Sequence, residues 1–379
     1  APVVCLGPVA VETLSPRALN RATLARQLLL GRSEMPVLDA VEHLVGLQAQ
    51  VPHNPYTALW SRLDRFRPAE LAGLIEGRRA VRTVVMRATI HLVSADDCLA
   101  LRPLMQPVLD AELSRHPEFS PELRGVDLRP VLALAHELLG ERPLTQAEIR
   151  AAMQERFPGL HSGALAYACR CLLPLVQVPP RGLWGRSGQV RSATAESWLG
   201  RPLAADPSID AAVLRYLGAF GPATAADVAT WSRLTGLRPV LERLRSRLRT
   251  FRDERGRELF DLPDAPRPDP AMPAPPRFLP EYDNALLSHA DRSRVVPDEA
   301  RARLSAAGGV GVGSVLVDGL LAAVWRLERD RGSGGSTLVV RHLPMSKRAA
   351  ASVAAEGRRL LRLMAAGAPQ ADVRLEAAP

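Results

Sequence analysis

The feature that most constrains the fold is a repeated order of predicted elements: three times, two or three helices are followed by a β-hairpin. Capping boxes, in which a Ser or Thr precedes a carboxylate by three residues, mark helix starts at Ser94, Thr145 and Thr224. The last two lie about 80 residues apart, which is the spacing of domains and not of a solenoid repeat. We therefore expect an α+β protein with three tandem winged-helix units.

The repeats divide the chain into five segments. We expect an N-terminal extension (1–13), a first winged helix (14–118), a second (119–204), a third with a proline-rich linker (205–277), and a C-terminal β-domain with a helix (278–379). Helices are predicted over 15–30, 36–47, 131–139, 162–176 and 239–248, with others starting near Tyr56, Pro68, Ser94, Thr145, Pro207 and Thr224. Wings are predicted over 81–93, over 178–186 and around Arg255-Gly256.

The C-terminal segment changes to strands punctuated by glycine. Asp318-Gly319 stands between two apolar runs, which is a strong signal for a β-hairpin. A further strand is predicted over 337–342 and an arginine-rich helix over 346–364. We expect a small β-domain that resembles a barrel.

The charge balance favours nucleic acid as the partner. The net charge is +9, and Lys347 is the single lysine among 49 basic residues. The forked guanidinium of arginine matches phosphate well. The alternative is a solvated arginine face that reflects coding bias.

Cysteine usage and hydropathy favour a reduced cytoplasm. The four cysteines (Cys5, Cys98, Cys169 and Cys171) offer neither zinc-like spacing nor a disulfide framework, so no metal or cofactor is expected. Residues 1–13 lack a basic n-region and are interrupted by Pro2 and Pro8, and nowhere do 18 apolar residues follow one another. Secretion and membrane insertion are therefore not expected.

Position 48 breaks the pattern of the helix expected over 36–47. Four apolar residues follow at helical spacing, and the same face continues at position 48 with a glutamine. Burying an unpaired amide costs on the order of 1–3 kcal/mol. If the chain leaves the helix in an extended segment, Gln48 and Gln50 face the same side and line one pocket. The alternative is a helix C-terminus whose glutamines bond to free carbonyls.

An ordered set of short motifs resembles the AlkZ/YcaQ family of interstrand-crosslink DNA glycosylases, and its AlkZ-type members most. The motifs are Gly46-Leu47-Gln48-Ala49-Gln50, Pro55-Tyr56 with Leu59-Trp60, Met86 to Ser94, Pro179 to Trp184, Ala219 to Thr224 with Trp231, Leu279 to Asn284, Ser288 to Arg292, and Val315 to Gly319. They cover nearly the whole chain in order. The resemblance implies three winged helices curved into a C-shaped, basic DNA channel, a C-terminal β-domain, and a catalytic pair at Gln48 and Gln50.

Two neutral amides restrict the chemistry that this pair can support. An amide is too weak a base to deprotonate water, so it can only orient the water and stabilise charge in the transition state. This suffices when the leaving base departs easily, as a cationic N7-alkylguanine does. We expect a monofunctional glycosylase without a lyase step, because the single lysine lies in the C-terminal helix.

Other polar residues are candidates for DNA contact or for support of the channel. Arg87, Thr89 and His91 alternate on a predicted strand, where an exposed polar face is the alternative. Arg181, Trp184 and Arg186 lie on the second wing and suit phosphate contact or insertion, unless the tryptophan anchors the wing to its own core. The expected support of the channel or of contacts between domains comprises Asn54, Tyr282, Asp283, Asn284, His289 and Arg292.

The sequence thus predicts a DNA glycosylase that excises N7-alkylguanine and unhooks crosslinks, and the resemblance implies a part in resistance to an azinomycin-like alkylator. The expected partner is double-stranded DNA with alkylated guanine. We expect a cytoplasmic monomer, associated with the nucleoid when it is bound to DNA, without an obligate protein partner. Two alternatives stay open: a winged-helix regulator without enzymatic activity, and a glycosylase restricted to monoadducts.

Overall fold

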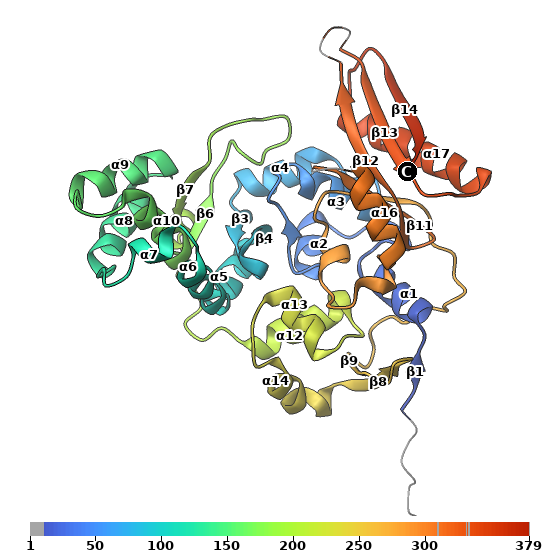
Figure 1. Ribbon diagram of the computed structural model, residues 1–379, viewed down its shortest axis with the longest axis horizontal. Coiled ribbons are helices and arrows are strands. Elements are labelled where there is room, and N and C mark those ends of the chain that lie inside the picture. Colours follow the sequence, from blue (N-terminus) through green and yellow to red (C-terminus); the bar gives the residue numbers. More distant parts are fainter. Residues whose placement is uncertain (1–10, 309–310, 331, 333, 379) are drawn as a thin grey trace, which may run out of the picture.

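The computed structural model describes residues 11–308, 311–330, 332 and 334–378 (Figure 1). Most of the expected N-terminal extension, residues 1–10, lies outside the described residues. Strand β1 (Thr13–Leu14) pairs in parallel with β8 (Arg249–Asp253). Two strands that lie far apart in the sequence are therefore neighbours in one sheet.

Two stretches of the chain share one order of elements, namely a helix, a short strand, two helices and a two-stranded hairpin, and a third stretch has the same order without the short strand. The first comprises α2 (Val37–His43), β2 (Leu47–Gln48), α3 (Asn54–Arg62), α4 (Pro68–Glu76), β3 (Ala80–Val84) and β4 (Ile90–Ser94). The second comprises α8 (Arg129–Glu141), β5 (Leu144–Thr145), α9 (Gln146–Arg156), α10 (Ser162–Leu172), β6 (Leu175–Gln177) and β7 (Arg191–Thr194). The third comprises α12 (Ile209–Phe220), α13 (Ala225–Ser232), α14 (Leu237–Leu244), β8 and β9 (Glu258–Asp261). We call these stretches units one, two and three.

The strand order is also the same in each unit. The short strand lies beside the last strand of the hairpin, which gives β2-β4-β3 in unit one and β5-β7-β6 in unit two. In unit three a single bridge between Ala223 and Phe260 takes the place of the short strand. Because β3 also pairs with β6, units one and two form one six-stranded sheet. Figure 1 shows unit two at the left of the molecule and unit three below unit one.

Several predicted helices end earlier than expected, and those predicted over 15–30, 36–47 and 239–248 end at Arg26, His43 and Leu244. The long helix from Ser94 is divided into α5 (Ala95–Leu104) and α6 (Gln106–Arg115), because Pro107 has no N–H with which to continue the helical hydrogen bonds. The helix expected over 162–176 ends at Leu172 and is followed by β6. The capping boxes at Thr145 and Thr224 are confirmed. Each threonine side chain accepts the backbone N–H three residues later, and the carboxylate at that position accepts the backbone N–H of the threonine.

Between and after the units lie short connecting helices. They are α7 (Phe119–Glu122) and α11 (Ala195–Leu199), whereas the 3-10 turn Arg245–Arg247 lies within unit three, between α14 and β8.

The C-terminal segment is an open sheet and not a barrel. Its strands follow the order β10 (Arg277–Leu279), β11 (Gly313–Val317), β12 (Leu320–Arg329), β13 (Ser336–His342) and β14 (Ala371–Ala377). The hairpin predicted at Asp318-Gly319 is confirmed. One face packs with α17 (Lys347–Met364) and α3, and the other packs with α16 (Asp298–Gly308) and with α1 (Pro16–Arg26). Since helices bury both faces, the sheet does not need to close on itself.

Helix α1 connects unit three with the C-terminal sheet through ion pairs. Arg26 pairs with Asp261 through both carboxylate oxygens, and both side chains are fully buried. Arg21 on the same helix pairs with Asp318 of the β11–β12 turn. The helix therefore holds two parts of the chain that lie far apart in the sequence.

Replacing Asp261 tests the buried pair. In Asp261→Asn, the guanidinium of Arg26 stays buried without a carboxylate, so the free energy of unfolding is expected to fall by about 3–5 kcal/mol. Urea unfolding followed by circular dichroism measures it. The control is Asp127→Asn, which removes an exposed pair with Arg129 and is expected to leave stability unchanged. Equal stability of the two variants would contradict the assignment.

Candidate functional site

Gln48 lies on a strand, which agrees with the extended exit segment considered above, but the helix before it ends at His43 and not near position 47. Helix α2 ends at His43, and Val45 and Gly46 then adopt positive φ angles of 53° and 88° that turn the chain into β2. A Cβ on Gly46 would lie 2.7 Å from Cγ1 of Val93, so only glycine fits this turn. The helical spacing of apolar residues continued by chance through a turn.

Each of the two glutamines accepts a hydrogen bond from a backbone N–H group. Gln48 is opposite His91 across β2 and β4, and its side chain is buried. Its Oε1 accepts the backbone N–H of Gln50 at 3.1 Å. The side chain of Gln50 is exposed, and its Oε1 accepts the N–H of Ile90 at 3.4 Å. Gln48 thus has a fixed carboxamide, and Gln50 reaches the surface beside it.

Arg87, Thr89 and His91 do not alternate on one strand as predicted. The chain must turn between β3 and β4, and Arg87 lies in that 3-10 turn (Met86–Ala88) with a φ of 58°. Thr89 donates its hydroxyl to the Met86 carbonyl at 3.1 Å, and His91 alone lies in β4. His91 has no exposed surface, and Arg87 and Thr89 are half-buried.

These residues form a buried hydrogen-bond network instead. Nδ1 of His91 donates to the Thr89 carbonyl at 3.1 Å, which leaves Nε2 to accept from Arg87 at 3.3 Å. Arg87 also donates to Oδ1 of Asn284 at 2.6 Å and to the Trp231 carbonyl at 3.2 Å. Burial, with the charge of Arg87, lowers the pKa of His91 to about 3, so this histidine is neutral.

The Asp283–Asn284 pair connects this network to α3 and to β2. Both oxygens of Asp283 accept from Arg62 at 2.8 Å, and Asp283 also caps α15 (Asn284–Leu287) through the N–H of Ala285. Nδ2 of Asn284 donates to the Gly46 carbonyl at 3.2 Å. Asn284 therefore holds the turn before Gln48 on one side and Arg87 on the other.

Other residues of the expected support lie in different places. Asn54 is close to the motif and donates to the Glu281 carbonyl at 2.7 Å, whereas Tyr282 is exposed. His289 packs against unit three, where its Nε2 bonds to the Phe220 carbonyl at 2.9 Å, and burial lowers its pKa to about 4. Arg292 opens a 3-10 turn (Arg292–Arg294) and is half-buried. The structure does not bring these six residues into one cluster.

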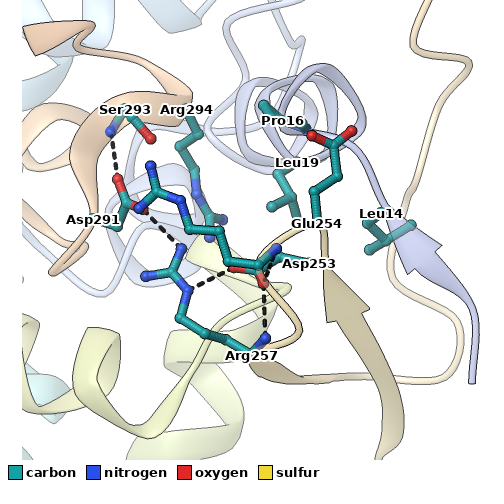
Figure 2. A pocket seen from close by; sticks show the side chains of 10 residues that line it. Leu14, Pro16, Leu19, Asp253, Glu254, Arg257, Asp291, Ser293 and Arg294 are labelled. Atoms are coloured by element: carbon teal, nitrogen blue, oxygen red, sulfur yellow. Dashed lines mark hydrogen bonds and ion pairs between the residues drawn. The ribbon is translucent and has the colours of Figure 1, made fainter.

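A cavity of about 170 Å³ lies beside this last segment, between α1 and the β8–β9 turn (Figure 2). Its charged groups bond mainly to one another: Asp291 pairs with Arg255 and Arg257, and Arg257 also pairs with Asp253. None of the lining residues belongs to the Gln48–Gln50 motif. The cavity is therefore not part of the candidate site.

The segment between β6 and β7, which was predicted as the second wing, packs against unit one next to the motif. The Trp184 ring lies 4.9 Å from that of Tyr56 and 5.9 Å from that of His53, and the Tyr56 hydroxyl donates to the Gly182 carbonyl at 2.9 Å. The tryptophan thus anchors the wing to α3 and not to the core of its own unit. Arg181 is half-buried and bonds to the Gly188 carbonyl, and Arg186 is exposed.

Sequence reasoning missed two arginines at the site, Arg62 and Arg82. Arg82 is 2% exposed and donates from Nη2 to the carbonyl of Ala49, the central residue of the motif, at 2.9 Å. Arginines are so frequent in this chain that neither stood out. The one signal was that position 82 is charged within a run of small and β-branched residues that reads as a buried strand.

The part of the chain that the structure describes contains no group of histidine, cysteine, aspartate and glutamate suited to a metal ion. Among the same residues, no helix is long and apolar enough to span a bilayer.

Comparisons with known proteins agree on one family. The family model described as DNA glycosylase AlkZ-like matches residues 41–363. A solved structure, the DNA glycosylase AlkZ of Streptomyces sahachiroi, superimposes with a TM-score of 0.73 at 21% sequence identity and covers 96% of this chain and 100% of its own. No curated protein sequence matches the chain.

The buried His91 predicts a pH dependence of stability. The unfolded histidine takes up a proton below its ordinary pKa of 6.5, and the folded one does not until about 3. The free energy of unfolding should therefore fall as the pH falls from 6.5, by up to about 1.4 kcal/mol per unit. His91→Gln is expected to remove this part of the slope between pH 6.5 and 5 in urea unfolding. The exposed His136→Gln serves as control, and the same slope in His91→Gln as in the wild type would refute the assignment.

Proposed function

The chain belongs to the AlkZ-like family of DNA glycosylases, and we propose that it hydrolyses the N-glycosidic bond of cationic N7-alkylguanine with Gln48 and Gln50 as the catalytic residues. The observation that carries the proposal is the pair of neutral carboxamides: one is fixed and buried at the end of β2, and the other is exposed two residues later. A regulator has no need of this arrangement.

In the proposed reaction the two amides orient a water molecule toward C1′ of the deoxyribose. An amide oxygen has two lone pairs, so Oε1 of Gln48 can accept the Gln50 N–H and still accept from water. Departure of N7-alkylguanine relieves its positive charge, so a strong base and a general acid are not required. The enzyme is then monofunctional, and the base leaves without cleavage of the strand.

We further propose that the three units are winged helices that surround a C-shaped, basic DNA channel. The support is the common order of their elements and strands and the net charge of +9. The corresponding domains are 14–118, 119–204, 205–277 and 278–379. The half-buried or exposed Arg181, Trp184 and Arg186, with Arg87 and Thr89, are the proposed DNA contacts, and the fully buried His91 supports the motif.

The biological setting belongs to the same proposal. The substrate is double-stranded DNA with alkylated guanine, including interstrand crosslinks, and the protein acts as a cytoplasmic monomer in resistance to an azinomycin-like alkylator. A guanine held in a crosslink cannot leave the duplex alone, so such an enzyme works in an open channel and not in a deep base pocket.

Glutamine variants test the catalytic pair. Wild-type protein is expected to produce alkali-labile abasic sites in duplex DNA that contains N7-methylguanine. Gln48→Ala and Gln50→Ala each remove a group that orients water, so the single-turnover rate should fall by about 100-fold. The exposed Gln154→Ala on α9 is the matched control. Full activity of both variants would contradict the assignment, and an inactive wild type that still binds DNA would favour the regulator.

Crosslinked substrates test the breadth of activity. Incubation with duplex DNA crosslinked between two N7 positions of guanine is expected to release both strands on a denaturing gel after alkali. Release of base from monoadducts while crosslinks stay intact would restrict the enzyme to monoadducts. Borohydride is expected to trap no covalent complex, because the proposed mechanism forms no Schiff base.

A further inference from the structure

A buried arginine lies directly behind the glutamine motif. Arg82 projects from β3 and is 2% exposed, and its Nη2 donates to the Ala49 carbonyl at 2.9 Å. Its Nε and Nη1 are buried and have no hydrogen-bond partner in the described part of the chain. No carboxylate among those residues pairs with it. A buried cation with unsatisfied donors destabilises a fold, so its presence here calls for another explanation.

The bond from Arg82 acts on the peptide unit that holds Gln48. The Ala49 carbonyl and the Gln50 N–H are the two ends of one planar trans peptide and point in opposite directions. Arg82 holds the oxygen end, and the N–H end donates to Oε1 of Gln48 at 3.1 Å. The guanidinium therefore fixes the orientation of this peptide, and with it the direction in which the Gln50 N–H donates to the Gln48 side chain.

Charge strengthens this connection. A hydrogen bond from a guanidinium is stronger than one from a neutral donor, and hydrogen bonds in a chain polarise one another. Burial lowers the pKa of Arg82 to about 10, so it still carries its charge at neutral pH. The polarised Gln50 N–H then binds Gln48 more firmly than an isolated peptide would.

The second wing sets the position of Arg82. Gly182 has a φ of 98°, and a Cβ there would lie 2.8 Å from Cδ of Arg82. The same residue accepts the Tyr56 hydroxyl at 2.9 Å, which holds the wing on α3. The wing therefore packs directly on the side chain that holds the motif.

We propose that Arg82 is a positioning residue for the glycosylase reaction: through the Ala49–Gln50 peptide it orients the Gln48 carboxamide, and the second wing holds Arg82 in place. The proposal rests on the proposed function of the glutamine pair. Arg82 does not touch the substrate. It orients the Gln48 carboxamide before DNA binds.

Arg82→Met tests the proposal, because methionine keeps an unbranched buried side chain without donors. The single-turnover rate of N7-methylguanine release should fall by 10- to 100-fold. The Kd for the same duplex should change less than twofold, since Arg82 is buried. The Tm should stay the same or rise, because two unsatisfied donors are removed. A residue with a merely structural role would lower Tm and rate together.

Two further variants complete the experiment. In Gly182→Ala, the added Cβ would displace the Arg82 side chain. The single-turnover rate should fall, with little change in the Kd for the duplex. The exposed Arg150→Met on α9 is the matched control and should behave like the wild type. Arg82→Lys keeps a cation and should recover part of the lost rate.

The outcomes distinguish a failure of the role proposed for Arg82 from a failure of the proposed function. Wild-type rate in Arg82→Met overturns the proposal, and so does a rate that falls only in step with Tm. If Arg82→Met does not fold, the proposal depends on Gly182→Ala, and an unchanged rate in that variant overturns it. An inactive wild type would overturn the proposed function itself, which is a different result from an active wild type with an active Arg82→Met.

Discussion

The ion pair between Arg62 and Asp283 is the interaction on which the geometry of the site depends. Both side chains are buried, and both carboxylate oxygens accept from the guanidinium, so the pair fixes the segment after the proline-rich linker against α3. Asp283 also starts α15, whose first residue, Asn284, bonds to Gly46 and to Arg87. One buried contact thus sets the turn before Gln48 and the network beneath it.

A second constraint is the continuity between units. The hairpin of unit one extends through β3 and β6 into the hairpin of unit two, and buried residues of all three units share one hydrophobic cluster. The buried ion pair between Arg26 and Asp261 connects α1 with unit three. Buried ion pairs contribute little net stability, but removing one partner is costly, so they favour a single arrangement of the elements that they connect. They suit a protein whose proposed channel must keep its shape.

The site combines this rigidity with weak chemical groups. Neutral amides neither gain nor lose a proton near neutral pH, so their contribution depends on orientation alone. His91 is kept neutral by burial, and Arg82 keeps its charge. The surroundings of the motif therefore supply fixed dipoles and hydrogen bonds, and the proposed substrate supplies the good leaving group.

The sequence by itself determined the order of elements, because periodicity, capping boxes and turn residues are local signals. Thr145, Thr224 and Asp318-Gly319 were found in this way, and the motif at Gln48 and Gln50 was found by its polarity and resemblance. Only the tertiary structure decided that Gln48 lies on a strand, that the C-terminal sheet stays open, and that Trp184 packs on Tyr56. It also decided the roles of Arg62 and Arg82, since their partners, Asp283 and Ala49, lie 221 and 33 positions away in the chain. Contacts over such distances depend on how whole elements pack, and no local pattern encodes them.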